Sequence, residues 1–220
     1  MNILSLDIDY ISDIYAQEIL HPGIPEAPEK DYWNLVRDLS SRISEEVIIE
    51  NRSNVRYLFK LFLSSITTNS KVVFGIHHDS ILSYIPKDTK SINLLNVDHH
   101  HDLGYNELQE VQASSYQVCT ESNWVAILAD KLDTYTWVRN KGSESRFNEE
   151  NFPYKFKFEQ VVNTEALDTS NVSWDLIYVC LSPNYLYDKH WVYFYLLLDI
   201  YETLSGHNVV VDKSRYNTKF

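Results

Sequence analysis

The chain has 220 residues, of which 44% are hydrophobic, and it carries a net charge of −12. This length and composition predict a single domain, residues 1–220, with a sizeable core, and five glycines and six prolines exclude collagen-like and linker-rich chains. The negative charge disfavours nucleic acid and anionic membranes as partners, since both bind clustered lysine and arginine, and it favours a cationic substrate or ordinary solubility.

The first elements in chain order are a strand, a loop and two helices. Residues 2–8 (NILSLDI) are typical of a buried strand that ends in acids. The proline-broken segment 21–31 predicts a loop. Residues 32–43 and 53–68 have the apolar spacing of amphipathic helices, and Ser53 is the expected N-cap of the second helix.

The rest of the chain alternates between apolar strands and helices. Strands are predicted at 71–76, 92–97, 158–163, 174–181 and 207–211, and helices at 121–132, capped by Ser122, and at 188–204. Near-continuous apolar strands separated by helices indicate a mostly parallel sheet that is covered on both faces. The predicted fold class is therefore α/β, with three layers in the order α/β/α.

The two cysteines, Cys119 and Cys180, form no CxxC motif and are too few for a disulfide scaffold. A reducing, cytoplasmic compartment fits this cysteine usage. The first residues carry acids and lack the basic start of a secretory signal. No apolar run approaches the roughly 18 residues that a membrane span requires.

Acidic and histidine residues cluster at the ends of three predicted strands. Asp7 and Asp9 end the first strand, His77 and His78 follow the strand at 71–76, and the run 98–102 (DHHHD) follows the strand at 92–97. Parallel strands bring their carboxyl ends to one edge of the sheet, which is where such folds bind ligands. We therefore expect the three clusters to meet.

The spacing within these clusters predicts a metal site. Residues two apart at a strand end point to one side, so Asp7 and Asp9 form a pair of poorly solvated, mutually repelling carboxylates. The run from Asp98 through His100 to Asp102 repeats this spacing. The predicted metal ligands are Asp7, Asp9, His78, Asp98, His100 and Asp102.

This set of oxygen and nitrogen donors suits Mn²⁺ or a similar divalent ion better than a thiolate zinc site. Because six ligands exceed the needs of one tetrahedral ion, the prediction is a pair of ions, two Mn²⁺ or other divalent cations. A water between them would be acidified for attack on carbon or phosphorus. Each motif alone has a plainer explanation, such as a polyhistidine surface turn, and the argument depends on all three being at strand ends.

The same clusters resemble the metal motifs of the arginase–agmatinase (ureohydrolase) superfamily. Residues 75–78 (GIHH) resemble its Gly-Gly-Asp-His-Ser motif, 98–102 its Asp-Ala-His-x-Asp motif and 5–9 (SLDID) its Ser-x-Asp-x-Asp motif. The resemblance implies an arginase-like fold, a Mn²⁺ pair and hydrolysis of linear amidine C–N bonds by a metal-bridging hydroxide. It also implies that Asp102 is both a metal ligand and the catalytic residue that orients the hydroxide.

The order of the motifs is unusual, because the family places the Ser-x-Asp-x-Asp segment third and this chain begins with it. This order and the short chain are similar to the compact branch that includes the peptide arginases. Those enzymes convert arginine side chains of ribosomally made peptides to ornithine and release urea. The resemblance thus implies a peptide with arginine side chains as substrate, and the many tyrosines and tryptophans suit either a docking surface or the core.

Two family positions are not kept. Asn123 matches the substrate-contacting asparagine, but Val125 stands at the proton-shuttle histidine and Cys180 at the glutamate that holds the guanidinium. Either another acid, Glu121 or one in the 13–31 loop, holds the substrate cation, or the substrate is not a guanidine. The alternative proton shuttles are His77, His99, His101 and His190.

Three other functions compete with this interpretation. The segment 97–100 (VDHH) resembles the motif of the DHH-type manganese phosphoesterases, although the early histidine and the glycine-rich motif of that family are missing. A haloacid-dehalogenase-like phosphatase would explain Asp7 and Asp9 but leave the histidines unexplained. A non-catalytic, metal-stabilised peptide-binding module would share the metal site and differ in having no turnover.

Overall fold

The computed structural model describes residues 1–11, 51–104, 119–140, 143, 152–162, 167, 169, 171–183, 186 and 190–214. The predicted loop 21–31 and helix 32–43 lie outside the described residues. That residues 1–220 form one domain stays a prediction.

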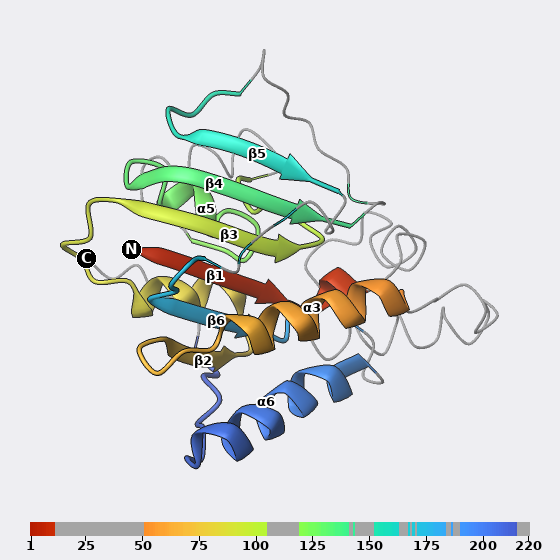
Figure 1. Cartoon of the computed structure of the whole chain (residues 1–220). Coiled ribbons are helices and arrows are strands. Elements are labelled where there is room, and N and C mark those ends of the chain that lie inside the picture. The colour runs from red at the N-terminus through yellow and green to blue at the C-terminus, as the bar shows by residue number, and fades with distance from the viewer. Residues whose placement is uncertain are drawn as a thin grey trace.

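Six strands form one sheet in the order β2-β6-β1-β3-β4-β5, and every neighbouring pair is parallel (Figure 1). The predicted α/β class with a parallel sheet is confirmed. The strands are β1 Asn2–Asp7, β2 Lys71–Gly75, β3 Ile92–Asp98, β4 Leu132–Arg139, β5 Lys157–Val161 and β6 Leu176–Cys180.

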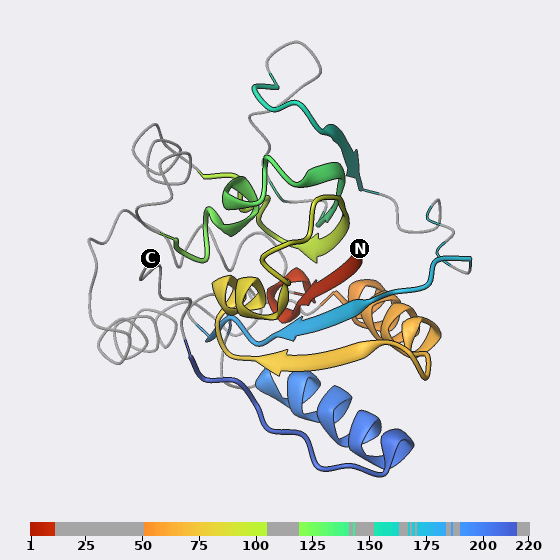
Figure 2. The same cartoon turned by 90° about the vertical axis from the view of Figure 1, so that its left-hand side faces the viewer.

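Helices cover both faces of this sheet. The helices α3 (Arg52–Ser65) and α6 (Trp191–Ser205) pack with the short 3-10 helix η1 (Ile8–Ile11) on one face. The other face carries the 3-10 helix η3 (His78–Tyr84) and the short helix α5 (Trp124–Ile127). Figure 2 shows this division, with α3 in orange on the right of the sheet and η3 and α5 in yellow and green on its left.

Helix α3 illustrates how the sequence fixes an element. Its N-cap is Asn51, whose side chain accepts hydrogen bonds from the backbone N–H groups of Ser53 and Asn54. The prediction of Ser53 as the cap is therefore wrong by two residues. Its buried side includes Phe62, which packs edge-to-face on Phe74 of β2 at 5.9 Å between ring centroids. This contact anchors the helix to the sheet.

The segment after residue 120 corrects the predicted helix 121–132. The helix is limited to Trp124–Ile127, its N-cap is Asn123 rather than Ser122, and the chain turns into β4 at Leu132. Strand β4 buries Tyr135, Trp137 and Val138 fully, and aromatic and β-branched residues of this kind favour a strand. The apolar spacing of the sequence therefore did not predict β4, which lies inside the sheet between β3 and β5.

The end of the described chain also differs from prediction. In place of a strand at 207–211 there is an isolated parallel bridge between Gly75 and Asp212. The predicted strands 158–163 and 174–181 and the helix 188–204 are present with shifted ends, as β5, β6 and α6. Among the described residues, no helix combines the length and the apolar character needed to cross a bilayer.

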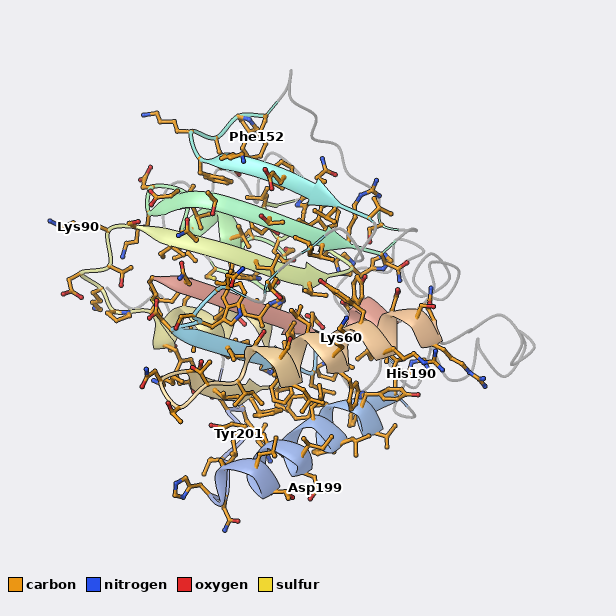
Figure 3. All side chains as sticks on the ribbon, viewed as in Figure 1. Lys60, Lys90, Phe152, His190, Asp199 and Tyr201 are labelled. Carbon is orange, nitrogen blue, oxygen red and sulfur yellow. The ribbon has the colours of Figure 1, made fainter. Side chains whose placement is uncertain are left out.

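Because all strands of the sheet run in the same direction, they all begin at one edge of the sheet and all end at the opposite, carboxyl edge. Figure 3 marks them with Lys90, just before β3 at the edge where the strands begin, and His190, at the start of α6 on the side toward which the strands run. The acidic and histidine clusters follow β1, β2 and β3, so they belong to the second edge.

Candidate metal centre

The three clusters of the sequence meet at the carboxyl edge of the sheet. Strand β1 pairs with β3 on one side and with β6 on the other, and β6 pairs in turn with β2, so β3 lies one strand spacing and β2 two strand spacings from β1. All six predicted ligands come together there. The side chain of His100 is 22% exposed. The other five are at most 3% exposed: Asp7, Asp9, His78, Asp98 and Asp102.

A first group of donors surrounds the imidazole of His78. Its Nδ1 lies 3.0 Å from Oδ2 of Asp7, 3.2 Å from Oδ2 of Asp98 and 3.2 Å from Oδ2 of Asp102. Neighbouring ligands of one octahedral ion at about 2.1 Å are about 3 Å apart. The spacing of these atoms is therefore that of ligands on a single cation.

A second group lies beside the first and shares Asp98 with it. Nδ1 of His100 is 3.0 Å from Oδ2 of Asp9 and 3.9 Å from Oδ1 of Asp98. The two oxygens of Asp98 thus face different imidazoles, Oδ2 toward His78 and Oδ1 toward His100. This is the arrangement of a carboxylate that bridges two ions.

Backbone N–H groups fix the carboxylates in place. The N–H of Asp9 donates to Oδ1 of Asp7 at 3.0 Å, that of His99 to Oδ1 of Asp9 at 3.1 Å, and that of His100 to Oδ1 of Asp98 at 2.7 Å. The hydrogen bond from His99 to Asp9 therefore ties the loop after β3 to the segment that follows β1.

Side chains outside the predicted set orient the ligands. Nε2 of His78 lies 2.6 Å from Oγ of Ser5, which directs Nδ1 of the ring toward the carboxylates. The indole N–H of Trp124 donates to Oδ2 of Asp102 at 2.6 Å. Ser182 donates to Oδ2 of Asp7, and the side-chain amide of Asn96 donates to Oδ2 of Asp98 at 3.1 Å.

Gly75 makes room for the support of the histidine pair. A Cβ at this position would collide with the hydroxyl of Tyr178, so only glycine permits the tyrosine to lie here. The hydroxyl donates to the carbonyl of His77 at 2.7 Å, and the ring is stacked parallel to that of His78, with centroids 6.3 Å apart. The first residue of the GIHH motif is therefore a glycine because the Tyr178 hydroxyl occupies the space that a side chain would need.

Backbone strain is concentrated at the same place. Among the described residues other than glycine, Asp102 and Ser182 have positive φ angles, of 51° and 45°. This conformation is uncommon for residues with a Cβ, and such strain is typical of functional sites. Both side chains contact the cluster, Asp102 directly and Ser182 through Asp7.

The pKa shifts of these side chains reflect an excess of buried negative charge in the cluster. Burial raises the pKa of Asp9 and of Asp102 well above the usual value, and neighbouring carboxylates raise it further. Burial opposes the charged form of His78, but the hydrogen bonds that its ring donates to Asp7 and Asp98 outweigh this effect and raise the pKa of the imidazole. Burial also opposes ionisation of Asp98, yet the hydrogen bond and charge of His78 hold its pKa below the usual value.

These donors fit divalent metal ions. Four buried carboxylates repel one another when they are ionised, and a cation reduces both this repulsion and the cost of burying the charges. Three groups of described residues have ligand atoms within 4.8 Å of one another: Asp7 with His78 and Cys180, Asp9 with Asp98 and His100, and His78 with Asp98 and Asp102. Asp98 belongs to two of these groups.

The other residues named from the sequence lie around this centre. Asn123 is fully buried and its Oδ1 accepts a hydrogen bond from the N–H of Thr120 at 2.7 Å, so it holds the turn before α5. Val125 is buried in the core. His77 forms a buried pair with Glu121, with 2.7 Å between Nδ1 and Oε1.

The other histidines named as candidate proton shuttles, His99, His101 and His190, are also buried. Nδ1 of His101 accepts a hydrogen bond from the N–H of Leu103 at 3.1 Å, and the ring meets that of Trp137 edge-on. His190 is 2% exposed at the start of α6.

One cavity of the described residues lies at the opposite edge. It has a volume of about 380 Å³, and residues at or near the starts of strands line it, among them Asn2, Asn93, Thr134 and Trp174. Among the described residues that line it, none has a titratable side chain. The buried histidine and aspartate groups that could hold metal ions lie at the carboxyl edge and not at this cavity.

Several members of the site were not predicted from the sequence. Trp124 and Ser182 give no motif signal, because each reaches its aspartate from a distant strand or helix. Ser5 is part of the SLDID motif and lies two residues before Asp7, on the same face of β1. The period of a strand could therefore have identified it as a neighbour of the ligands.

The chain was compared with known proteins. It matches no protein-family model, no curated protein and no solved structure. The resemblance to the ureohydrolases therefore rests on the three short motifs. What the structure adds is a parallel α/β sheet with buried histidine and aspartate groups that could hold metal ions.

Proposed function

We propose that the chain is a hydrolase with two adjacent divalent metal sites, occupied by Mn²⁺ or a similar ion. The observation that carries this proposal is the shared carboxylate of Asp98, which faces His78 with one oxygen and His100 with the other. A buried acid whose two oxygens face two different imidazoles suits the bridge between two cations.

The residues divide between the two sites. His78, Asp102 and Asp7 would hold the first ion, and His100 with Asp9 the second, with Asp98 common to both. The bound ions would supply Lewis acidity and lower the pKa of a water toward neutrality.

The protein's own side chains would position the reacting groups. Trp124 fixes the rotation of the Asp102 carboxylate by donating to its Oδ2. Asp102 would accept a hydrogen bond from the attacking water and so aim it at the substrate, a role that requires a fixed carboxylate.

For the substrate we propose the guanidinium of an arginine side chain in a peptide. The three motifs support this class, and the net charge of −12 favours a cationic substrate over a polyanion. The buried carboxylate of Glu121, which pairs with His77 next to the ligand His78, is the candidate acceptor for the substrate cation. Water would add to the guanidinium carbon, a proton would pass to the side-chain nitrogen as its C–N bond breaks, and the peptide would retain an ornithine side chain while urea is released.

The test is urea release by the Mn²⁺-loaded protein from an arginine-containing peptide, with free arginine and a phosphodiester measured in parallel. We expect urea from the peptide, and none from the Asp98→Asn variant. Cleavage of the phosphodiester without urea would transfer the function to the DHH-type phosphoesterases. Metal binding without turnover of any of the three would overturn the guanidinium substrate and favour a binding role.

A further inference from the structure

The metal centre has a sulfur atom at its border. Cys180 is the last residue of β6 and is paired in register with Asp7 of β1 on one side and with Gly75 of β2 on the other. Paired residues of parallel strands point to the same face, so the thiol stands beside the Asp7 carboxylate. Gly75 has no side chain to separate the thiol from the histidines that follow β2.

The thiol lies within ligand distance of the first site. Sγ of Cys180, an oxygen of Asp7 and a nitrogen of His78 are all within 4.8 Å of one another, and Cys180 is 0% exposed. Its nearest polar contacts are Oγ of Ser182 at 3.1 Å and the carbonyl of Ile76 at 3.6 Å. Ser182 also donates to Asp7, so one serine orients both the sulfur and the carboxylate.

We propose that Sγ of Cys180 is a ligand of the metal ion held by His78, so that the two sites of the centre are chemically unequal. This inference rests on the proposed metal centre. On binding, the thiol would lose its proton to solvent and the thiolate would coordinate the ion. The His78 site would then have sulfur, nitrogen and oxygen donors, while the His100 site has only nitrogen and oxygen donors.

Two consequences follow for the ions and the substrate. A thiolate favours Zn²⁺, Co²⁺ or Fe²⁺, so the His78 site would select a softer ion than the His100 site. The carboxylates of Asp7, Asp9, Asp98 and Asp102 balance two divalent cations, and a thiolate adds one further negative charge. A cationic substrate group would balance that charge.

The experiment is a titration of the metal-free protein with Co²⁺ followed by absorption spectroscopy. A thiolate on Co²⁺ gives a charge-transfer band in the near ultraviolet, whereas nitrogen and oxygen ligands give only the weaker visible bands. Cys119 supplies the matched control, because it is the second cysteine of the chain and belongs to no donor group among the described residues.

We expect the charge-transfer band in the wild type and in Cys119→Ser, and its loss in Cys180→Ser with the visible bands retained. Since Cys119→Ser contains Cys180 as its single thiol, its band assigns the ligand even if Cys180→Ser does not fold. Visible bands without a charge-transfer band in Cys119→Ser would overturn the inference and leave the metal centre intact. Absence of all Co²⁺ bands would overturn the metal centre and the inference together.

Discussion

Oγ of Ser5 lies 2.6 Å from Nε2 of His78, and this contact determines which nitrogen of the ring faces the carboxylates. If the hydroxyl accepts the Nε2 proton, the lone pair of Nδ1 is directed at the site that Asp7, Asp98 and Asp102 enclose. Partners of this kind raise the basicity of a ligand and hold its orientation. Ser5 is thus a positioning residue of the proposed centre.

Replacing this serine tests its role. Ser5→Ala should lower the affinity for the ion at the His78 site by about 10- to 100-fold, as is typical for loss of a partner behind a metal ligand. Isothermal titration with Mn²⁺ would measure it. The control is Ser65→Ala, since Ser65 is equally buried but lies in α3, away from the centre. An unchanged affinity in Ser5→Ala would contradict the role assigned to the hydroxyl.

The proposed bridging role of Asp98 predicts a difference in the number of ions bound by two variants. Asp98→Asn keeps the shape of the side chain but removes the charge that both sites share, so both ions should be lost. Asp9→Asn removes a ligand of the His100 site only, and one ion should remain. Metal analysis after dialysis measures the number of ions per chain. Equal losses in the two variants would show that Asp98 does not bridge.

Removal of the metal should change how stability depends on pH. The pKa values of Asp9, Asp102 and His78 are raised in the metal-free fold, so the folded state binds more protons than the unfolded chain. The stability that the raised pKa of His78 contributes is complete below its ordinary value of 6.5 and is lost as the pH rises through the folded value.

We therefore expect the metal-free protein to become less stable as the pH rises above 6.5, whereas the metal-loaded protein does not. Metal binding also displaces these protons, so the stabilisation by Mn²⁺ should grow with pH. Thermal unfolding with and without a chelator, from mildly acidic to mildly alkaline pH, measures both effects. A gain from Mn²⁺ that is constant over this range would argue against proton displacement from the cluster.

A second pH effect involves a pair outside the centre. The hydroxyl of Tyr84 donates to Oδ2 of Asp212 at 2.7 Å, and Ser214 also donates to this carboxylate. Burial opposes ionisation of Asp212, but the hydrogen bonds from Ser214 and Tyr84 outweigh it and lower the pKa of the carboxyl. Its contribution to stability is present above the ordinary value of 3.8 and is lost as the pH falls through the lower folded value.

Asp212→Asn should therefore lower the unfolding free energy at neutral pH by a small amount, because the carboxyl is only partly buried, and should have a smaller effect in strong acid. Denaturant unfolding at neutral and at acidic pH compares the two conditions. A loss that is equal at both would mean that the charge of Asp212 does not contribute.

The features that could be predicted are those that local sequence patterns determine, and the features that were missed depend on contacts between distant residues. The strand ends at Asp7 and Asp98 were predictable, since apolar runs mark buried strands and parallel strands share an edge. Strand β4 was not predicted: the helix expected at 121–132 reaches only its first residue, and the polar, charged and aromatic residues that follow form no continuous apolar run. Trp124 and Ser182 could not be found, since their contacts with Asp102 and Asp7 depend on the tertiary fold.

The buried pair of Glu121 and His77 supports the last prediction. Both side chains are about one-tenth exposed, with 10% for His77 and 9% for Glu121, and the pair lies next to the ligand His78. If Glu121 accepts the substrate cation, Glu121→Gln removes a charge-assisted hydrogen bond of about 1.5–3 kcal/mol. We expect kcat/KM for the arginine peptide to fall about 10- to 100-fold, chiefly through KM, with the metal content unchanged.

The matched control for this prediction is Glu159→Gln, because Glu159 is half-exposed on β5 and pairs with Lys157 on the same strand. It should leave kcat, KM and the metal content as they are. A fall in metal content in Glu121→Gln would identify the pair as a support of His78 instead of a substrate contact. A fall in kcat alone would point to proton transfer during the reaction, since a group that only binds the substrate cation acts equally on the ground state and the transition state.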